Sequence, residues 1–73
     1  MTVKDWFTGR RYRHYKGSEY VGLCLAKEES TQANLCVYQS VENGQVWVRP
    51  HEEFFGLATL KETGERVPRF ART

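Results

Sequence analysis

No run of apolar residues in this chain approaches the ~20 that a membrane-spanning helix needs, and the opening segment MTVKDWFTGRR lacks the apolar core of a signal peptide. The sequence therefore predicts a protein of the cytoplasm with no membrane partner. Cysteine is scarce too, since Cys24 and Cys36 stand alone, without the paired CxxC spacing of a zinc site. In a reducing compartment we expect both to be free, buried thiols.

Motifs of catalysis and cofactor binding are also missing. The chain has no Gly-rich phosphate loop, no HExxH helix and no Gly-x-Ser-x-Gly elbow. His14 and His51 are too few for a zinc site, which takes about three protein ligands or more. Glu52 and Glu53 are neighbours that point apart, which favours a solvated turn. We therefore expect a binding protein and no enzyme, with no cofactor and no metal.

The chain is short, and its 73 residues predict a single domain. A chain of this length buries only about 60% of the surface that its unfolded form exposes. Two Trp, four Tyr and four Phe supply most of a small core. Little room is left for a deep cavity, so we expect a shallow site or one shared between the subunits of a homo-oligomer.

Charge is unevenly spread along the sequence, although the net value is only +2. Residues 1–16 carry five basic residues and one acidic residue, and the remainder carries six basic and eight acidic ones. The first part therefore suits an anionic partner, either a small molecule or a nucleic acid. The net charge of the whole chain is far less basic than that of a dedicated nucleic-acid binder.

Short strand patterns separated by turn residues run through the chain. Residues 1–9 form an N-terminal lead-in, with Trp6 and Phe7 as an anchor, and residues 10–73 form the single domain. The expected strands are 10–15, 20–26 (a central strand), 35–42, 45–49, 57–61 and 66–70, with one helical turn in 51–56. Five or six short strands in so few residues predict a mostly-β fold, a small SH3-like barrel.

The clearest turn signal is Asn43-Gly44, which lies between two alternating segments. A two-residue type I′ hairpin needs φ > 0 at both positions and fixes the register of its strands. Val41 then pairs with Val46, and Tyr38 with Arg49. Side-chain alternation predicts a core face of Val37, Val41, Val46 and Val48, and an opposite face of Cys36, Tyr38, Ser40, Trp47 and Arg49.

That opposite face is the main candidate for a binding surface, because aromatic rings stack on planar groups and guanidinium groups pair with anions. We expect five side chains to converge on it, namely Arg13, Tyr38, Trp47, Arg49 and Arg69, with His14 nearby. Alternation places Arg13 and His14 on opposite sides of their strand, so at most one of the two can point inward. Each has a structural alternative. Trp47 and Tyr38 suit a core, Arg49 suits a cation–π contact, and the basic residues of 10–16 suit a solubilised edge strand. Neighbouring charge is expected to disfavour protonation of His14.

Four ordered blocks of the chain resemble a family of short bacterial and phage proteins, domain of unknown function 1653. The blocks are YRHYKG at residues 12–17, VYQ at 37–39, WVRP at 47–50 and VPRF at 67–70, with Tyr20 and Phe54 between them. The resemblance implies an SH3-type small barrel, and no catalytic role can be carried over from it. A His-Ser-Glu-Thr stretch that is usual in the family is replaced here by Glu-Glu-Ser-Thr at residues 28–31.

The sequence thus favours a small binding module for an anionic or nucleotide-like ligand. A nucleic-acid or protein interaction module of SH3-like type is the alternative, and a small enzyme is the third reading. Ligand identity and oligomeric state do not follow from these patterns.

Overall fold

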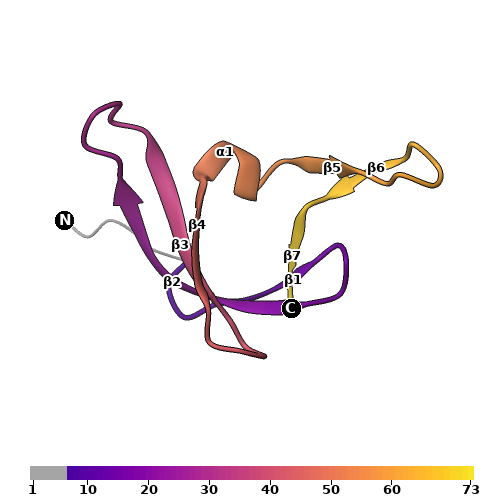
Figure 1. Cartoon of the computed structure of the whole chain (residues 1–73), viewed down its shortest axis with the longest axis horizontal. Helices are drawn as coiled ribbons and strands as arrows, with labels where there is room; N and C mark the ends of the chain where they lie inside the picture. The colour runs from indigo at the N-terminus through magenta and orange to yellow at the C-terminus, as the bar shows by residue number, and fades with distance from the viewer. Residues whose placement is uncertain (1–6) are drawn as a thin grey trace.

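The computed structural model describes residues 7–73 and shows a bent five-stranded antiparallel sheet beside a two-stranded one (Figure 1). The large sheet has the strand order β4-β3-β2-β1-β7, and the small one pairs β5 with β6. The elements are β1 (Arg11–His14), β2 (Glu19–Lys27), β3 (Asn34–Ser40), β4 (Val46–Pro50), α1 (His51–Phe54), β5 (Leu57–Thr59), β6 (Arg66–Pro68) and β7 (Phe70–Arg72).

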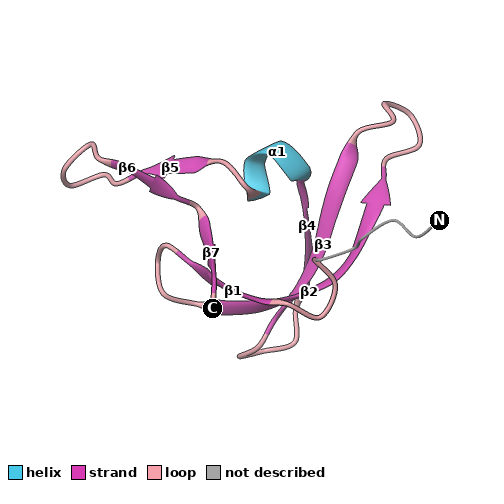
Figure 2. Ribbon diagram, turned by 180° about the vertical axis from the view of Figure 1, so that it is seen from behind, coloured by secondary structure: helices cyan, strands magenta, loops and turns pink. Residues whose placement is uncertain are grey.

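The mostly-β class with one short helical turn is confirmed, and β2 is central as expected. The sheet is open rather than a closed barrel, because β4 and β7 stand at opposite edges of the large sheet. α1 lies over the hollow of the bent sheet (Figure 2). The helix has only four residues, and no helix among the described residues is long and apolar enough to cross a membrane.

One expected strand, residues 66–70, is split in two. Residues Arg66–Pro68 pair with β5, and Phe70–Arg72 pair with β1, so the chain changes sheets at Arg69. This switch gives seven strands in the described part instead of five or six. It also places β1 between β2 and β7, so the expectation of an edge strand for the basic segment is wrong.

The core is aromatic and fills the concave side of the sheet, the side that α1 covers. Phe54 of α1 stacks on Phe70 of β7 at 4.0 Å between ring centroids, and its ring lies 5.1 Å from that of Tyr38. Phe7 is also buried, which agrees with the expected anchor, whereas Trp6 lies outside the described residues. The buried cluster consists of Phe7, Tyr12, Cys36, Tyr38, Phe54 and Phe70.

Gly22 explains how Phe7 reaches this core from the lead-in. A Cβ atom at Gly22 would lie 2.4 Å from the backbone oxygen of Phe7 and 2.9 Å from its ring. No other residue leaves that space. The register of β2 against β3 also shifts between Gly22 and Cys24, and such an irregularity bends a strand.

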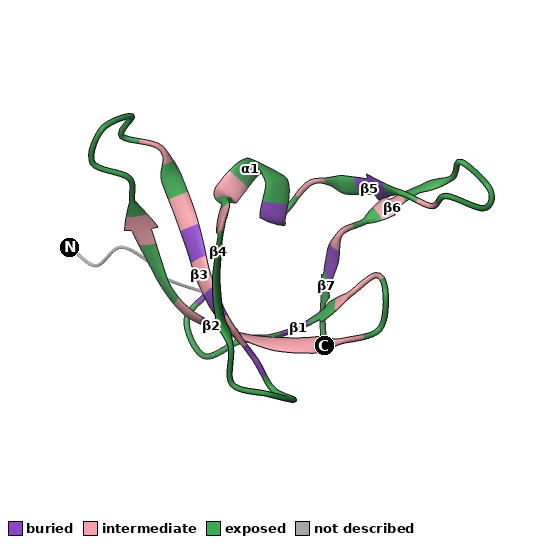
Figure 3. Ribbon diagram, viewed as in Figure 1, coloured by how far each residue is buried: buried purple, intermediate pink, exposed green. Residues whose placement is uncertain are grey.

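The predicted valine core face is wrong. Val41, Val46 and Val48 are about half exposed, and the buried residues of β3 are Cys36, Tyr38 and Ser40. The physical reason is that α1 and β7 fold back over the aromatic face, where large rings fill more of the hollow than valines would. The valine side is the convex, outer face of the sheet, and Figure 3 shows β4 exposed over most of its length.

The hairpin between β3 and β4 has a longer loop than predicted. Tyr38 pairs with Trp47 and Gln39 with Val46, while the Ser40 amide donates to the carbonyl of Gln45 at 2.8 Å. Gly44 has φ +75° as expected, but Asn43 is not among the residues with positive φ. The register differs from the prediction by two residues, so the residues predicted to share a face still do.

The two cysteines differ in environment. Cys36 is fully buried, and burial raises the pKa of its thiol to about 11. Cys24 is exposed, which corrects the expectation that both would be buried. The bulge in β2 turns Cys24 toward the convex face, where it pairs with Val37. Both are free cysteines.

Candidate functional site

Arg49 and Arg69 come from distant parts of the chain and meet at Glu53 of α1. The Arg49 guanidinium lies on the concave face, since Arg49 pairs with buried Cys36, and its Nη1 is 3.3 Å from Glu53 Oε1. Arg69 sits in the bend between β6 and β7. Its Nε donates to the Glu53 carbonyl at 3.1 Å, and its Nη2 donates to the Leu57 carbonyl at 3.3 Å. Both cations are therefore held in place by the turn that α1 forms.

The sequence pattern does not assign Glu53 to the site, because adjacent Glu52 and Glu53 favour a solvated turn. Its carboxylate is indeed exposed, but its position fixes both arginines. The signal that could have found it is the i,i+4 spacing from Arg49 to Glu53 across the start of the helical turn. One carboxylate beside two guanidinium groups leaves a net positive charge at this point.

His14 lies at the end of β1 on the same concave face. Its ring packs edge-on against Phe70 at 4.9 Å, and its Nδ1 accepts a hydrogen bond from the backbone N–H of Lys16 at 3.2 Å. Burial lowers the pKa of His14 below its ordinary value of 6.5, and the charges of Arg49, Lys16 and Arg69 lower it further. His14 is therefore neutral near pH 7, and the Nδ1 acceptor leaves Nε2 as the ring's N–H donor.

We call His14, Arg49 and Arg69 the arginine–histidine cluster. The three side chains lie on one side of the molecule, as the sequence predicted for them, and the two arginines are close enough to His14 to lower its pKa. One atom in the cluster stands out. The Nε of Arg49 is buried and has no hydrogen-bond partner within residues 7–73. An unpaired buried donor costs about 1–3 kcal/mol.

Two predicted aromatic residues have different places on this face. Tyr38 is only 5% exposed and packs against Phe54 and Phe70, so it belongs to the floor of the concave side. Trp47, its cross-strand partner on β4, is 50% exposed. The core interpretation of Trp47 is thus wrong, because β4 is an edge strand and nothing in residues 7–73 covers this ring fully. Trp47 shares its face with Arg49, two residues further along β4.

Arg13 does not join the cluster, which corrects the expectation that it converges with Arg49 and Arg69. It lies on the convex face, since it is adjacent to Tyr12 and His14 in β1 and strand side chains alternate. Its guanidinium pairs with the Glu19 carboxylate at 2.8 Å, and Arg11 lies 3.6 Å from the same group. Arg11 and Arg13 therefore share the Glu19 carboxylate on the convex face, away from His14.

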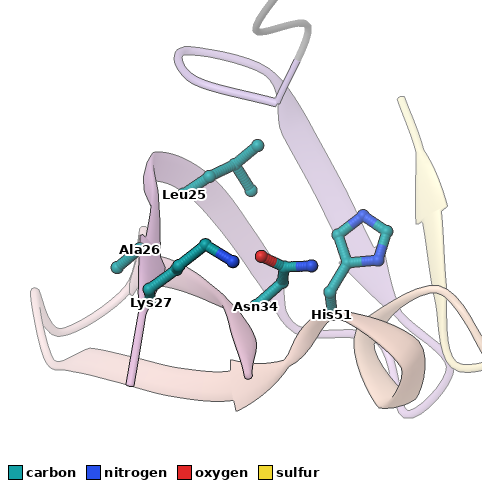
Figure 4. A pocket seen from close by; sticks show the side chains of 5 residues that line it. All are labelled: Leu25, Ala26, Lys27, Asn34 and His51. Carbon is teal, nitrogen blue, oxygen red and sulfur yellow. The ribbon is translucent and has the colours of Figure 1, made fainter. Parts of the chain in front are cut away.

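The best-formed hollows of the surface lie elsewhere. A cavity of about 380 Å³ opens at the far end of β2 and β3, where Lys27 and Asn34 face His51 of α1 beside Leu25 (Figure 4). Another, of about 420 Å³, lies between Lys16 and β5. The arginine–histidine cluster lines neither, so it is a surface site rather than a pocket. No group of three or more His, Cys, Asp or Glu side chains among residues 7–73 is placed to hold a metal ion.

These observations define a small, mostly-β domain whose open sheet carries a cationic cluster on its concave side. The family described as "Protein of unknown function (DUF1653)" matches residues 10–72, and the chain belongs to that family. The resemblance seen in the sequence blocks is thereby confirmed.

A solved structure with a similar fold comes from Bordetella bronchiseptica and is described as a protein belonging to DUF1653. It is 28% identical to this chain, with a TM-score of 0.74 over 94% of this chain and 90% of that one. No curated protein matches the chain.

Proposed function

We propose that this domain binds a small anionic ligand that carries a planar ring, such as a nucleotide, at the arginine–histidine cluster and Trp47. The observation that carries the proposal is the fixation of two guanidinium groups on Glu53 of α1. A cation that is already immobilised loses little conformational entropy when it binds an anion. We propose binding alone, without a catalytic step.

The charges of the cluster support an anionic ligand. Arg69 donates two hydrogen bonds to backbone carbonyls, and Arg49 donates one to the Glu53 carboxylate. A guanidinium group has five N–H donors, so each arginine has donors left over. The remaining donors suit the oxygen atoms of a phosphate or carboxylate. Neutral His14 adds an uncharged donor beside them, so the site keeps a hydrogen bond to the anion without a third full charge.

The planar part of the ligand has a matching surface in Trp47. Its ring is half exposed and lies on the same face as Arg49, about two residues of strand or ~7 Å away. That spacing is close to the separation between a base and its phosphate. Stacking on an exposed aromatic ring contributes roughly 1–3 kcal/mol per base.

The test compares adenosine 5′-monophosphate, adenosine and inorganic phosphate by NMR titration of the whole chain. We expect adenosine 5′-monophosphate to bind with shifts in the His14, Trp47 and Arg49 resonances. We expect the affinity for adenosine to be at least about tenfold lower than that for adenosine 5′-monophosphate, because adenosine lacks the anion. The Arg49→Gln variant should lose at least that factor toward the nucleotide and change little toward the nucleoside.

Arg13→Gln is the matched control, since this substitution removes an arginine from the opposite face and should leave the titration unchanged. Equal losses in Arg13→Gln and Arg49→Gln would contradict the site, as would the absence of binding by all three probes. The alternative, a nucleic-acid module, predicts a different result. Single-stranded RNA would then bind more tightly than the mononucleotide, with an affinity that falls steeply as salt rises.

A further inference from the structure

The strand β4 is an edge with exposed apolar side chains on both of its faces. Its neighbour in the sheet is β3, and no described strand lies on its other side. Val46, Trp47 and Val48 follow one another and are 45%, 50% and 58% exposed. Edge strands usually avoid such runs by carrying charges or bulges, because an open apolar edge pairs with other chains.

The register shows which backbone groups of β4 point outward. In an antiparallel ladder, residues that exchange hydrogen bonds with the neighbouring strand alternate with residues that do not. Ser40 bonds to Gln45, so Tyr38–Trp47 and Cys36–Arg49 are the next bonded pairs. Val46 and Val48 therefore direct their N–H and C=O groups away from β3, into the open edge.

We propose that two copies of this chain associate through β4, antiparallel and about a two-fold axis at Val48, so that their sheets join into one. In this register Val48 of one copy pairs with Val48 of the other, and Val46 pairs with Pro50. Trp47 of each copy then faces Arg49 of the second copy. The contact is isologous, because both copies use the same residues.

The hydrogen-bonding groups of β4 are self-complementary in this register. Pro50 has no N–H, so it offers nothing to the Val46 carbonyl of the second copy. That carbonyl is already satisfied, because the Gln45 side chain donates to it at 3.1 Å. The open edge of β4 thus lacks a donor at Pro50, and its acceptor at Val46 is already occupied. The two-fold axis at Val48 places Pro50 of one copy opposite Val46 of the other. An axis at Trp47 would instead require the filled Val46 carbonyl to accept again, from Val48.

The side chains of the two copies also match. On the convex face, Val46, Val48 and Pro50 of both copies form one continuous apolar row that extends the exposed valine side of the sheet. On the concave face, the half-exposed ring of Trp47 meets a guanidinium from Arg49 of the second copy, which is a cation–π pair. The occupant of the edge is therefore a second copy and not an unrelated peptide, which would lack this pairing of Pro50 with a filled acceptor.

A five-residue strand is small beside the ~1,200–2,000 Å² that stable interfaces bury, so the dimer should be weak and reversible. Sedimentation equilibrium of the whole chain, from about 10 µM to about 1 mM, is the test. We expect the average mass to rise toward twice the monomer over this range, whereas a constant monomer mass would overturn the proposal.

Charge substitution at Val48 tests the position of the axis. Val48→Lys alone and Val48→Glu alone should both remain monomers, because each places like charges opposite each other. An equimolar mixture of the two should recover a dimer at least as strong as that of the wild-type chain. Val41→Lys is the matched control, since Val41 is another valine that is about half exposed, in the loop before β4, and this variant should associate like the wild type.

Dimerisation of Val48→Lys alone, or failure of the mixture to recover dimers, would place the contact elsewhere and overturn the proposal. The Val48 substitutions leave the proposed ligand-binding side chains in place, because Val48 lies on the face opposite His14 and Arg49. Monomeric Val48→Lys should still bind adenosine 5′-monophosphate if the proposed function holds, so the two ideas fail separately.

Discussion

Single residues on the concave face owe their chemistry to neighbours that are remote in sequence. His14 is neutral because the aromatic core buries its ring and because Arg49, Lys16 and Arg69 surround it with positive charge. Glu53 holds both arginines in place from a helical turn of four residues. A local sequence window contains none of these relations except the spacing from Arg49 to Glu53 and the position of Lys16 two residues after His14.

The protonation of His14 provides a test at this scale. The NMR titration of its ring should give a pKa below 6.5 in the wild-type chain. Arg49→Gln should raise that pKa only in part, since burial is the largest cause of the shift. Arg66→Gln removes an exposed charge that does not act on His14, and it should leave the titration unchanged. A His14 pKa at or above 6.5 in the wild type would contradict this environment.

The same shift has a consequence for stability. The unfolded chain protonates His14 near pH 6.5, while the folded chain does so only at lower pH, so the unfolded state binds more protons between the two values. This contribution to stability is complete above pH 6.5 and is lost as pH falls toward the folded-state pKa. Urea unfolding of wild type and His14→Gln at several pH values measures it, and the variant should show the smaller loss in acid.

At the scale of elements, the loop between β3 and β4 sets which residues of the edge strand face one another. The Gly44 amide donates to the Ser40 carbonyl at 3.0 Å, and the Ser40 hydroxyl accepts from the amides of Glu42 and Asn43. This network closes a loop that is longer than a two-residue turn. Trp47 consequently faces Tyr38, and Arg49 stands beside the start of α1, within reach of Glu53.

Gly44 is the position where this loop demands glycine, because its φ is +75°. Gly44→Ala should destabilise the chain by about 1–2 kcal/mol, the cost of a left-handed conformation for a residue with a Cβ atom. Gly44→Asn should cost less, since asparagine tolerates that conformation better. Thermal unfolding measures the order of the two variants. Glu42→Ala, an exposed position in the same loop without positive φ, should change the melting temperature little, and an equal loss there would refute the explanation.

At the scale of the whole molecule, one phenylalanine connects the parts of the open sheet. Phe54 contacts the rings of Phe7, Tyr12, Tyr38 and Phe70, which come from the lead-in and from β1, β3 and β7. An open sheet has no closing strand pair, so the two ends of its strand order depend on such side-chain contacts. A chain of this size also has little other core to compensate for a loss.

Phe54→Ala should therefore cost about 3–5 kcal/mol and remove most of the stability of the domain. Its neighbour Phe55 is 37% exposed and provides the matched control, since Phe55→Ala deletes the same ring from a less buried place. Circular dichroism during urea unfolding compares the two. If Phe55→Ala is as damaging as Phe54→Ala, the core is not organised around Phe54.

Local patterns in the sequence were sufficient for most elements. Alternation and turn residues located the strands near residues 10–15, 20–26 and 57–61, and the helical turn within residues 51–56. These features depend on backbone preferences within a few residues, as at Gly44, so the folded structure contains them where the sequence predicts them. The shared face of Tyr38, Trp47 and Arg49 also survived, because an even register shift preserves the side on which each residue lies.

The tertiary structure alone decided which side of the sheet became the core. Alternation divides a strand into two faces but does not say which of them is covered, and that depended on α1 and β7 folding over the aromatic side. The same folding of α1 and β7 over the sheet brought Arg69 to Glu53. The strand order of the folded sheet left β4 as an open edge. Long-range contacts between distant segments determine burial, charge environment and exposed edges, so a pattern within one strand predicts the element but not its surroundings.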